Sequence, residues 1–184
     1  VSTDYAKIIQ SLDPHQLKYN GTATPKYFGS LINRISYGPV EVSFNISYKF
    51  GYVFRRYGVF TGLHSANWYN MAGYENRWQN PGDELNTKIP ALKYPINGSE
   101  GSFFQYSEDL VAPGDHIRLQ DIRIDFSLPH HLLNGKSIKR LTFFAYARNL
   151  GIIWRKNTIG IDPDYGTLNI PEPRLFSLGF NLTL

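Results

Sequence analysis

The side chains best suited to contact a ligand are aromatic rings in long stretches that lack hydrophobic alternation. The face of such a ring stacks on the C–H face of a sugar, and it packs a loop against its neighbours equally well. The candidates in these stretches are Trp68, Tyr69, Tyr74, Trp78, Tyr106 and Trp154. We predict that a ligand of this chain contacts rings of this set.

Few side chains could hold a metal ion. His130 and His131 are adjacent, so their side chains point apart, and no third ligand lies near them in sequence. Asp162 and Asp164, with the backbone around Gly166, form an oxygen-rich set of the kind that Ca²⁺ binds. The stretch "DPDYG" is equally ordinary turn chemistry. We predict no resident metal, and the sequence leaves calcium at this loop open.

No arrangement typical of an enzyme is present. The sequence has no cysteine, no G-x-S-x-G, no H-E-x-x-H and no glycine-rich phosphate loop. Nothing in the sequence places the paired carboxylates, Glu108–Asp109 and Asp162/Asp164, at the separation of a glycosidase pair. We therefore expect neither catalysis nor a cofactor.

Size and charge exclude some classes of protein. The 184 residues suffice for one domain with a sizeable core. They carry 19 basic and 15 acidic side chains, a net charge of +4. Because the charges are scattered, they form no basic stripe of the kind that binds nucleic acid. No run approaches the ~18 apolar residues of a membrane helix.

Long alternating segments dominate the chain. In residues 40–54 one parity is apolar throughout, with Val42, Phe44, Ile46, Tyr48, Phe50, Tyr52 and Phe54. Such alternation predicts strands near residues 26–37, 40–54, 116–128, 138–150 and 174–184. A change of parity predicts a bulge near Gln120–Asp121. Ahead of the strands we expect only a short helix, in "YAKIIQSLDPHQL", which Pro14 ends.

Strand length and connections favour a membrane barrel. Strands of soluble proteins most often have ~5–6 residues, whereas a tilted strand crosses a bilayer with ~9–11. The connections at 38–39 and 129–137 are short, and those at 55–115 and 151–173 are long. Outer-membrane barrels alternate short periplasmic turns with long extracellular loops in this way. We predict an all-β, antiparallel transmembrane β-barrel segment whose C-terminus lies on the periplasmic side.

The two parities then face different surroundings. The apolar parity from Val42 through Phe54 is expected to face lipid, and the polar parity to face the lumen. The lumen-facing candidates are Arg34, Glu41, Asn45, Lys49, Arg123, Asp125 and Arg148. Five strands are fewer than the ~8 of the smallest membrane barrels. We therefore expect further strands, from a longer chain or from other copies.

Six stretches carry the pattern of a known family. They are "TPKYFGSLINRISY" (24–37), "RWQNPGD" (77–83), "LVAPGDHIRLQDIRIDFSLP" (110–129), "LTFFAYARNLGIIWRK" (141–156), "GIDPDYG" (160–166) and "PEPRLFSLGFNLTL" (171–184). In this order they resemble the C-terminal end of SusC/RagA-type TonB-dependent outer-membrane transporters of the Bacteroidetes. The first 23 residues and the loop material at 55–75 and 84–107 match no family pattern.

The resemblance implies a 22-stranded barrel around a plug domain, of which residues 1–184 hold about the last five strands, with plug and TonB box outside them. It implies TonB-powered import of oligosaccharides or oligopeptides, with a SusD-like surface lipoprotein as a lid. The last strand is similar to the signal that the barrel-assembly machinery reads. The residues in its positions are Ser177, Gly179, Leu182 and Leu184, the last standing where Phe is usual.

Two other interpretations stay open. A soluble all-β carbohydrate-binding module could use the same aromatic loops. A siderophore or cobalamin receptor has the same barrel architecture. The sequence names no solute.

Overall fold

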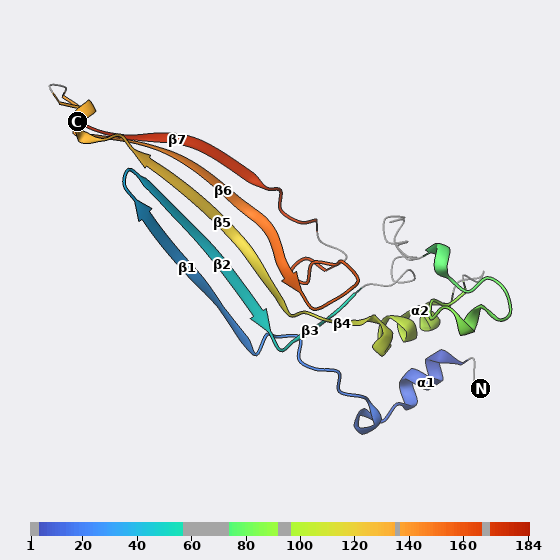
Figure 1. The fold of residues 1–184 in the computed structure, drawn as a ribbon. Helices are drawn as coiled ribbons and strands as arrows, with labels where there is room; N and C mark the ends of the chain where they lie inside the picture. Colours follow the sequence, from blue (N-terminus) through green and yellow to red (C-terminus); the bar gives the residue numbers. More distant parts are fainter. Residues whose placement is uncertain (1–3, 57–73, 92–96, 135–136, 167–169) are drawn as a thin grey trace. The chain divides into compact units, whose positions relative to one another are not determined.

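Two compact units make up the chain in the computed structural model, which describes residues 4–56, 74–91, 97–134, 137–166 and 170–184. The first unit takes residues 1–24, 52–113 and 159–169, and the second takes 25–51, 114–158 and 170–184. Their elements are labelled in Figure 1. Each unit is therefore built from segments that are distant in sequence.

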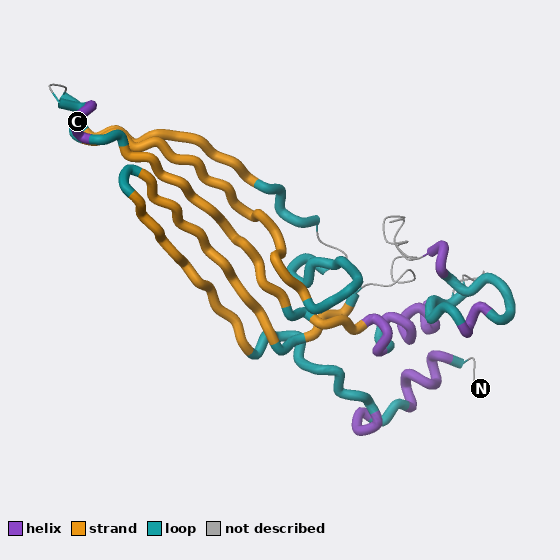
Figure 2. Tube along the Cα trace, viewed as in Figure 1, coloured by secondary structure: helices purple, strands orange, loops and turns teal. Residues whose placement is uncertain are grey.

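The second unit is one antiparallel sheet of five strands in the order β1-β2-β5-β6-β7 (Figure 1 and Figure 2). The strands are β1 (Tyr27–Tyr37), β2 (Val40–Phe50), β5 (His116–Ser127), β6 (Arg140–Arg155) and β7 (Leu175–Thr183). Each follows one of the predicted segments, so the expectation of long antiparallel strands is confirmed. Within the described residues, β1 and β7 are paired on one side only.

The register places the two parities on opposite faces of the sheet. One row across the five strands reads Ile35, Val42, Ile124, Ala145 and Leu178. The neighbouring row on the other face reads Arg34, Ser43, Arg123, Tyr146 and Ser177. We call the face of Val42 the apolar face and the face of Ser43 the polar face. The residues that alternate in the sequence thus form two separate surfaces, one on each side of the sheet.

The short connections are as predicted. Residues 38–39 form a two-residue turn between β1 and β2, in which Gly38 has a φ of 56°. A positive φ is what such hairpin turns require and what glycine adopts without steric cost. Between β5 and β6 the chain makes a short 3-10 helix, His130–Leu132. Both connections keep sequential strands antiparallel.

The predicted bulge in β5 is confirmed. Asn45 is opposite Asp121, but the next residue of β2, Ile46, is opposite Leu119. Gln120 is therefore the extra residue, and the pairing with β6 shifts at the same place. The bulge returns Leu119 and Ile117, which have the wrong parity in sequence, to the apolar face.

The predicted strand over residues 40–54 is wrong in its last part. The sheet strand β2 ends at Phe50, and Gly51 has a φ of 74°. That conformation turns the chain out of the sheet. Phe54 lies in a separate short strand, β3 (Val53–Arg55), and Tyr52 is buried at 8% exposure. Tyr52 and Phe54 belong to the first unit, so they do not continue the apolar face.

The strand predicted over 138–150 is longer than expected. β6 continues to Arg155 although Asn149 and Gly151 have φ values of 54° and 115°. The register with β5 shifts on both sides of these residues. The irregular backbone is therefore absorbed as bulges and does not end the strand.

The first unit holds the helices and a small sheet. Its described elements are α1 (Tyr5–Ser11), β3, α2 (Gly98–Gln105), β4 (Val111–Pro113) and the 3-10 helices Pro14–Gln16, Tyr74–Asn76, Asp83–Leu85 and Glu108–Leu110. The expected short helix is confirmed as α1, which Asp4 caps through the backbone N–H of Lys7. None of the described helices is long and apolar enough to cross a membrane.

Helix α2 was not expected from the sequence. Asn97 caps it by accepting from the backbone N–H groups of Ser99 and Glu100. Its Phe103 ring lies 5.5 Å from the ring of Tyr5 on α1. The capping Asn97 was the one sequence signal for this helix. Two glycines in eight residues give the segment a low helix propensity, so propensity alone does not predict it.

Candidate functional site

The structure brings all seven predicted lumen-facing residues onto one surface, the polar face of the sheet. The strand pairing places the following residues on that face: Arg34, Glu41, Asn45, Lys49, Arg123, Asp125 and Arg148. They come from four neighbouring strands, β1, β2, β5 and β6. The polar face is therefore the candidate functional site of the second unit.

Ion pairs on the polar face join neighbouring rows. Arg34 Nε lies 3.3 Å from Oε1 of Glu41. The other carboxylate oxygen of Glu41, Oε2, accepts from the Ser36 hydroxyl at 3.2 Å. The Arg34 side chain is 71% exposed. An exposed pair of this kind contributes about 0–1 kcal/mol, so it orients charge and adds little stability.

Arg123 and Asp125 form a pair with two hydrogen bonds on this face. Nε and Nη2 of Arg123 each donate to a separate oxygen of Asp125 at 2.7 Å. The guanidinium carbon also lies 4.4 Å above the ring centroid of Phe144. Two parallel charged hydrogen bonds fix the plane of the guanidinium, and that plane covers the ring.

A polar cluster surrounds the bulge of β5. Asn45 Nδ2 donates to Asp121 at 3.4 Å, and Gln120 Nε2 donates to the hydroxyl of Ser47 at 2.7 Å. Arg148, opposite Asp121 in the register, pairs with Glu172 at 3.5 Å. Amide, hydroxyl, carboxylate and guanidinium groups thus meet where the strands change register.

The predicted assembly residues divide between the faces. Ser177 and Gly179 lie in rows of the polar face, opposite Tyr146 and Phe144. Leu182 is opposite Leu141 on the apolar face. Leu184 follows the last residue of β7 and is 68% exposed.

Tyrosine and tryptophan occupy the ends of the apolar face. At one end are Tyr27, Tyr48 and Trp154, and at the other is Tyr37. The rows between them are aliphatic or phenylalanine, apart from Asn33 and three small residues on β6, Ala145, Ala147 and Gly151. Tyr and Trp prefer the interface between water and lipid, where a ring and a polar tip are both accommodated.

Trp154 is placed differently from the sequence prediction. It was expected just past the fourth strand, but it lies inside β6, opposite Ile117. Its ring meets that of Phe50 edge-on at 6.2 Å. The extension of β6 through its bulges causes the difference.

The segment 75–89 of the first unit is a loop closed by hydrogen bonds between its own residues. Trp78 donates its backbone N–H to the carbonyl of Ile89 at 3.0 Å and its indole N–H to the carbonyl of Asn80. Asp83 accepts the backbone N–H groups of Asn80 and Gln79 through one oxygen. These two bonds, that from Asn80 first, hold the pKa of Asp83 below its usual value. The half-buried Trp78 therefore braces its own loop.

A cavity of about 440 Å³ lies within this loop. Its lining is polar throughout and comes from Glu75, Asn76, Arg77, Gln79, Asn80, Asp83, Asn86 and Thr87. Trp68 and Tyr69 are outside the described residues, as is the side chain of Tyr74.

Arg55 holds the corner that follows α2. Its Nη1 donates to the carbonyls of Gln105 and Ser107 at 2.9 and 2.7 Å. Its guanidinium lies 5.6 Å from the ring centroid of Tyr106. Arg56 donates to the carbonyl of Asp109 at 3.1 Å. Neither arginine was predicted from the sequence, because the backbone carbonyls that they bind belong to residues far away in sequence.

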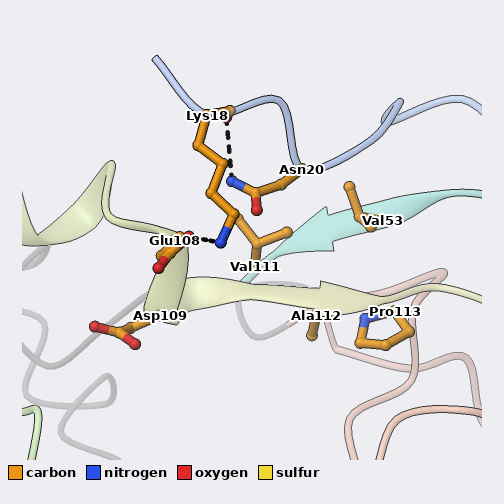
Figure 3. Close-up of a pocket in the computed structure, with 8 residues that line it drawn as sticks. All are labelled: Lys18, Asn20, Val53, Glu108, Asp109, Val111, Ala112 and Pro113. Atoms are coloured by element: carbon orange, nitrogen blue, oxygen red, sulfur yellow. Dashed lines mark hydrogen bonds and ion pairs between the residues drawn. The ribbon is translucent and has the colours of Figure 1, made fainter. Parts of the chain in front are cut away.

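Two lysines pair with the acidic residues of this corner. Lys18 pairs with Glu108 and Lys88 with Asp109. The hydrogen bond that Lys88 donates to the Asp109 carboxylate raises the pKa of Lys88 above its usual value. Figure 3 shows Lys18 reaching Glu108 across a cavity of about 330 Å³ that Val53, Val111 and Pro113 also line. Glu108 and Asp109 therefore act here as separate ion-pair partners.

The candidate metal positions show ordinary turn contacts. Asp162 accepts the backbone N–H of Asp164 through its carboxylate at 3.0 Å, and its carbonyl accepts from Tyr165 and Gly166. His130 Nδ1 lies 3.1 Å from the side-chain oxygen of Asn134. Within the described residues no three His, Asp or Glu side chains gather in a group that could hold a metal ion.

Comparisons with known proteins find likeness in three dimensions. No family model matches the chain, and no curated protein matches it. A solved structure of the RagAB peptide importer in the "open-open" state matches 91% of this chain, with a TM-score of 0.64 and 20% identity. The chain shares the fold of part of that importer.

Two further RagAB structures agree. The "closed-closed" state of the RagAB peptide importer matches with a TM-score of 0.63 and 20% identity over 90% of this chain. A structure of the RagAB peptide transporter matches with 0.61 and 17% over 89%. In each case the chain spans 18% of the length of the matched chain. The similarity concerns the fold of a segment.

Proposed function

We propose that this chain is part of the barrel wall of a SusC/RagA-type, TonB-dependent importer in a bacterial outer membrane. The observation that carries the proposal is the separation of the sheet into two faces of opposite character. The apolar face stays open to its surroundings, with Ile35 59%, Phe180 65% and Leu178 86% exposed. A lipid phase on one side and an aqueous lumen on the other satisfy both faces.

The dimensions of the sheet support a membrane-spanning role. The eleven residues of β1 extend about 34 Å at ~3.4 Å per residue. A strand tilt of ~40° reduces this to a height of about 26 Å, close to the ~25 Å apolar band of outer-membrane barrels. Tyr37 and Tyr27, at the two ends of β1, then lie at the two interfaces. The aromatic positions and the strand length thus agree with one another.

In this proposal the chain supplies transport structure and no catalysis. The polar face lines the lumen, the first unit belongs to the extracellular loops, and the C-terminus is periplasmic. Further strands, a plug and a TonB box come from outside these residues, and a SusD-like lipoprotein closes the channel. The solute is an oligosaccharide or an oligopeptide, and the similarity to RagAB peptide importers favours the latter.

Purification from native membranes in mild detergent tests the proposal. We expect this chain to run in one complex with a surface lipoprotein, and mass spectrometry of the complex to identify a bound peptide or glycan. A chain that remains soluble and monomeric without detergent would contradict the membrane role. A detergent-dependent complex that holds a siderophore or cobalamin and no lipoprotein would instead identify the receptor alternative.

A further inference from the structure

The alternation of β7 does not by itself determine how β7 aligns with β6. Along β7 the apolar face receives Phe176, Leu178, Phe180 and Leu182, and the polar face receives Leu175, Ser177, Gly179, Asn181 and Thr183. A shift by one residue exchanges the two faces, but a shift by two keeps every side chain on its face. Burial of apolar side chains therefore favours the native alignment only weakly over the alignments shifted by two residues.

The connection between the strands does not determine the alignment either. A two-residue hairpin fixes the register of its strands. β6 and β7 are instead joined through residues 156–174, far longer than the ~2–5 residues of a hairpin loop. Something in the sheet itself must select the alignment.

Phe144 and Gly179 are the pair that distinguishes one alignment from another. They are opposite each other in the register of β6 and β7. A Cβ built on Gly179 would lie 2.6 Å from Cζ and 2.9 Å from Cε1 of the Phe144 ring. Carbon atoms pack at ~3.5–4.0 Å, so the ring occupies the space that a side chain at position 179 would need. A two-residue shift would bring Ser177 or Asn181 into this space.

The ring cannot easily move aside. The Arg123 guanidinium lies 4.4 Å above its centroid, and the two 2.7 Å bonds that Arg123 donates to Asp125 hold the guanidinium in place. Displacing the ring breaks the cation–π contact and disturbs the ion pair. A chain of contacts therefore runs from Asp125 and Arg123 on β5, through Phe144 on β6, to Gly179 on β7.

We propose that Phe144 and Gly179 form a register lock, which selects the native alignment of β7 among those that its alternation permits. Covering a strand glycine with a cross-strand ring is a known means of pinning register. The other outer strand has the same arrangement, because a Cβ on Gly29 of β1 would lie 2.8 Å from the hydroxyl of Tyr48 on β2. There the turn at 38–39 already fixes the register, so the lock matters most at β7.

Disulfide trapping in the complete protein, in membranes, tests the lock. These 184 residues contain no cysteine, so within them only the introduced pair can form a disulfide. Ala145→Cys with Leu178→Cys reports the native alignment, and Ala145→Cys with Phe176→Cys or Phe180→Cys reports the shifted ones. Directly opposite Cβ atoms lie ~4.5–5.5 Å apart and diagonal neighbours ~7–8 Å. We expect the native pair to form at least tenfold faster than either shifted pair.

Removing the lock should reduce that preference. We expect Gly179→Ala and Phe144→Ala each to lower the ratio of native to shifted disulfide several-fold, and the double variant to be no worse than either single one. Thr183→Ala, on the same face of β7 but opposite Arg140, should leave the ratio unchanged. An unchanged ratio in both single variants would overturn the proposal. So would a double variant whose loss is the product of the two single losses, because the two residues would then act independently. If Gly179→Ala does not accumulate, Phe144→Ala decides alone, because it removes the ring and adds no clash.

The readout of this experiment is strand alignment and not transport. A failed lock would leave the proposed membrane role untouched. Failure of the membrane role would likewise leave the lock standing.

Discussion

Asp115 accepts the backbone N–H of Gly51 at 2.7 Å through Oδ1, and its Oδ2 lies 3.3 Å from the ammonium of Lys156. The backbone N–H of Lys156 also donates to the carbonyl of Asp115. One residue therefore ties the end of β2 to the start of β5 and the end of β6. Its side chain is only 16% exposed, so these bonds are partly shielded from water.

Removing this carboxylate should loosen the strand ends. We expect Asp115→Ala to lower the free energy of unfolding by about 1–3 kcal/mol, because a charged hydrogen bond and an ion pair are lost. Asp115→Asn should cost less, since it keeps an acceptor for Gly51. Urea unfolding of the protein in detergent, followed by tryptophan fluorescence, measures both. Glu41→Gln, in an exposed pair, is the control, and equal losses for Asp115→Ala and this control would refute the role.

The two faces of β2 should differ in their tolerance of charge. We expect Phe44→Arg, near the middle of the apolar face, to cost roughly 2–4 kcal/mol, as arginine does at the bilayer midplane. Ser43→Arg, one residue away on the polar face, should be tolerated. Folding yield in lipid vesicles and urea titrations measure the difference. Similar costs at both positions would count against a lipid-facing surface.

The loop at residues 75–89 should respond to acid through Asp83. Because the folded loop lowers the pKa of this carboxyl, ionised Asp83 stabilises the loop above its ordinary pKa of ~3.9. The contribution is lost as pH falls through the lower, folded pKa. We therefore expect Trp78 fluorescence to change only below about pH 3.9, with other tryptophans replaced by Phe.

Substitutions show whether Asp83 or a neighbouring group causes the acid transition in this experiment. In Asp83→Asn the acid transition should disappear, and the loop should already be looser at neutral pH. Glu75→Gln is the matched control, because the Glu75 carboxylate accepts neither of the two N–H groups that Asp83 holds. A transition that persists unchanged in Asp83→Asn would assign the acid response to another group.

The corner after α2 should depend on the guanidinium of Arg55. Both of its bonds come from Nη1, which the planar guanidinium holds rigidly, whereas a lysine ammonium sits on a flexible stem and cannot stack on Tyr106 as a plane. We expect Arg55→Lys to cost about 1 kcal/mol of local stability, which raises proteolytic cleavage near residues 105–109 about fivefold. Arg56→Lys keeps its single bond to Asp109 and should change the cleavage rate less. Equal rates in the two variants would argue against the two-carbonyl clamp.

The strands of the sheet could be predicted from the sequence because their alternation reflects two different surroundings. The parity change at Gln120 located the bulge, since a single extra residue is the simplest way to return Leu119 to the apolar face. The strand end at Gly51 could not be predicted in the same way. Alternation continues through Tyr52 and Phe54, while the positive φ of Gly51 already sends the chain elsewhere.

The candidate site was predictable only where it lies on the sheet. Strand parity alone places Arg34 and Asp125 on one face, whatever their partners. The contacts of Arg55 and the ring of Phe144 over Gly179 depend on residues far apart in sequence, so no local pattern contains them. Trp154 was misplaced because bulges allow β6 to continue through residues that usually end a strand.

Quenching by brominated lipid tests most directly the claim that the apolar face contacts lipid. A fluorophore is attached to single cysteines at Val42, Ser43, Phe44, Asn45 and Ile46, in the complete protein reconstituted into bilayers with brominated acyl chains. If the apolar face contacts lipid, quenching is strong at 42, 44 and 46, strongest at 44, and weak at 43 and 45. Equal quenching at both parities, or none at either, would contradict it.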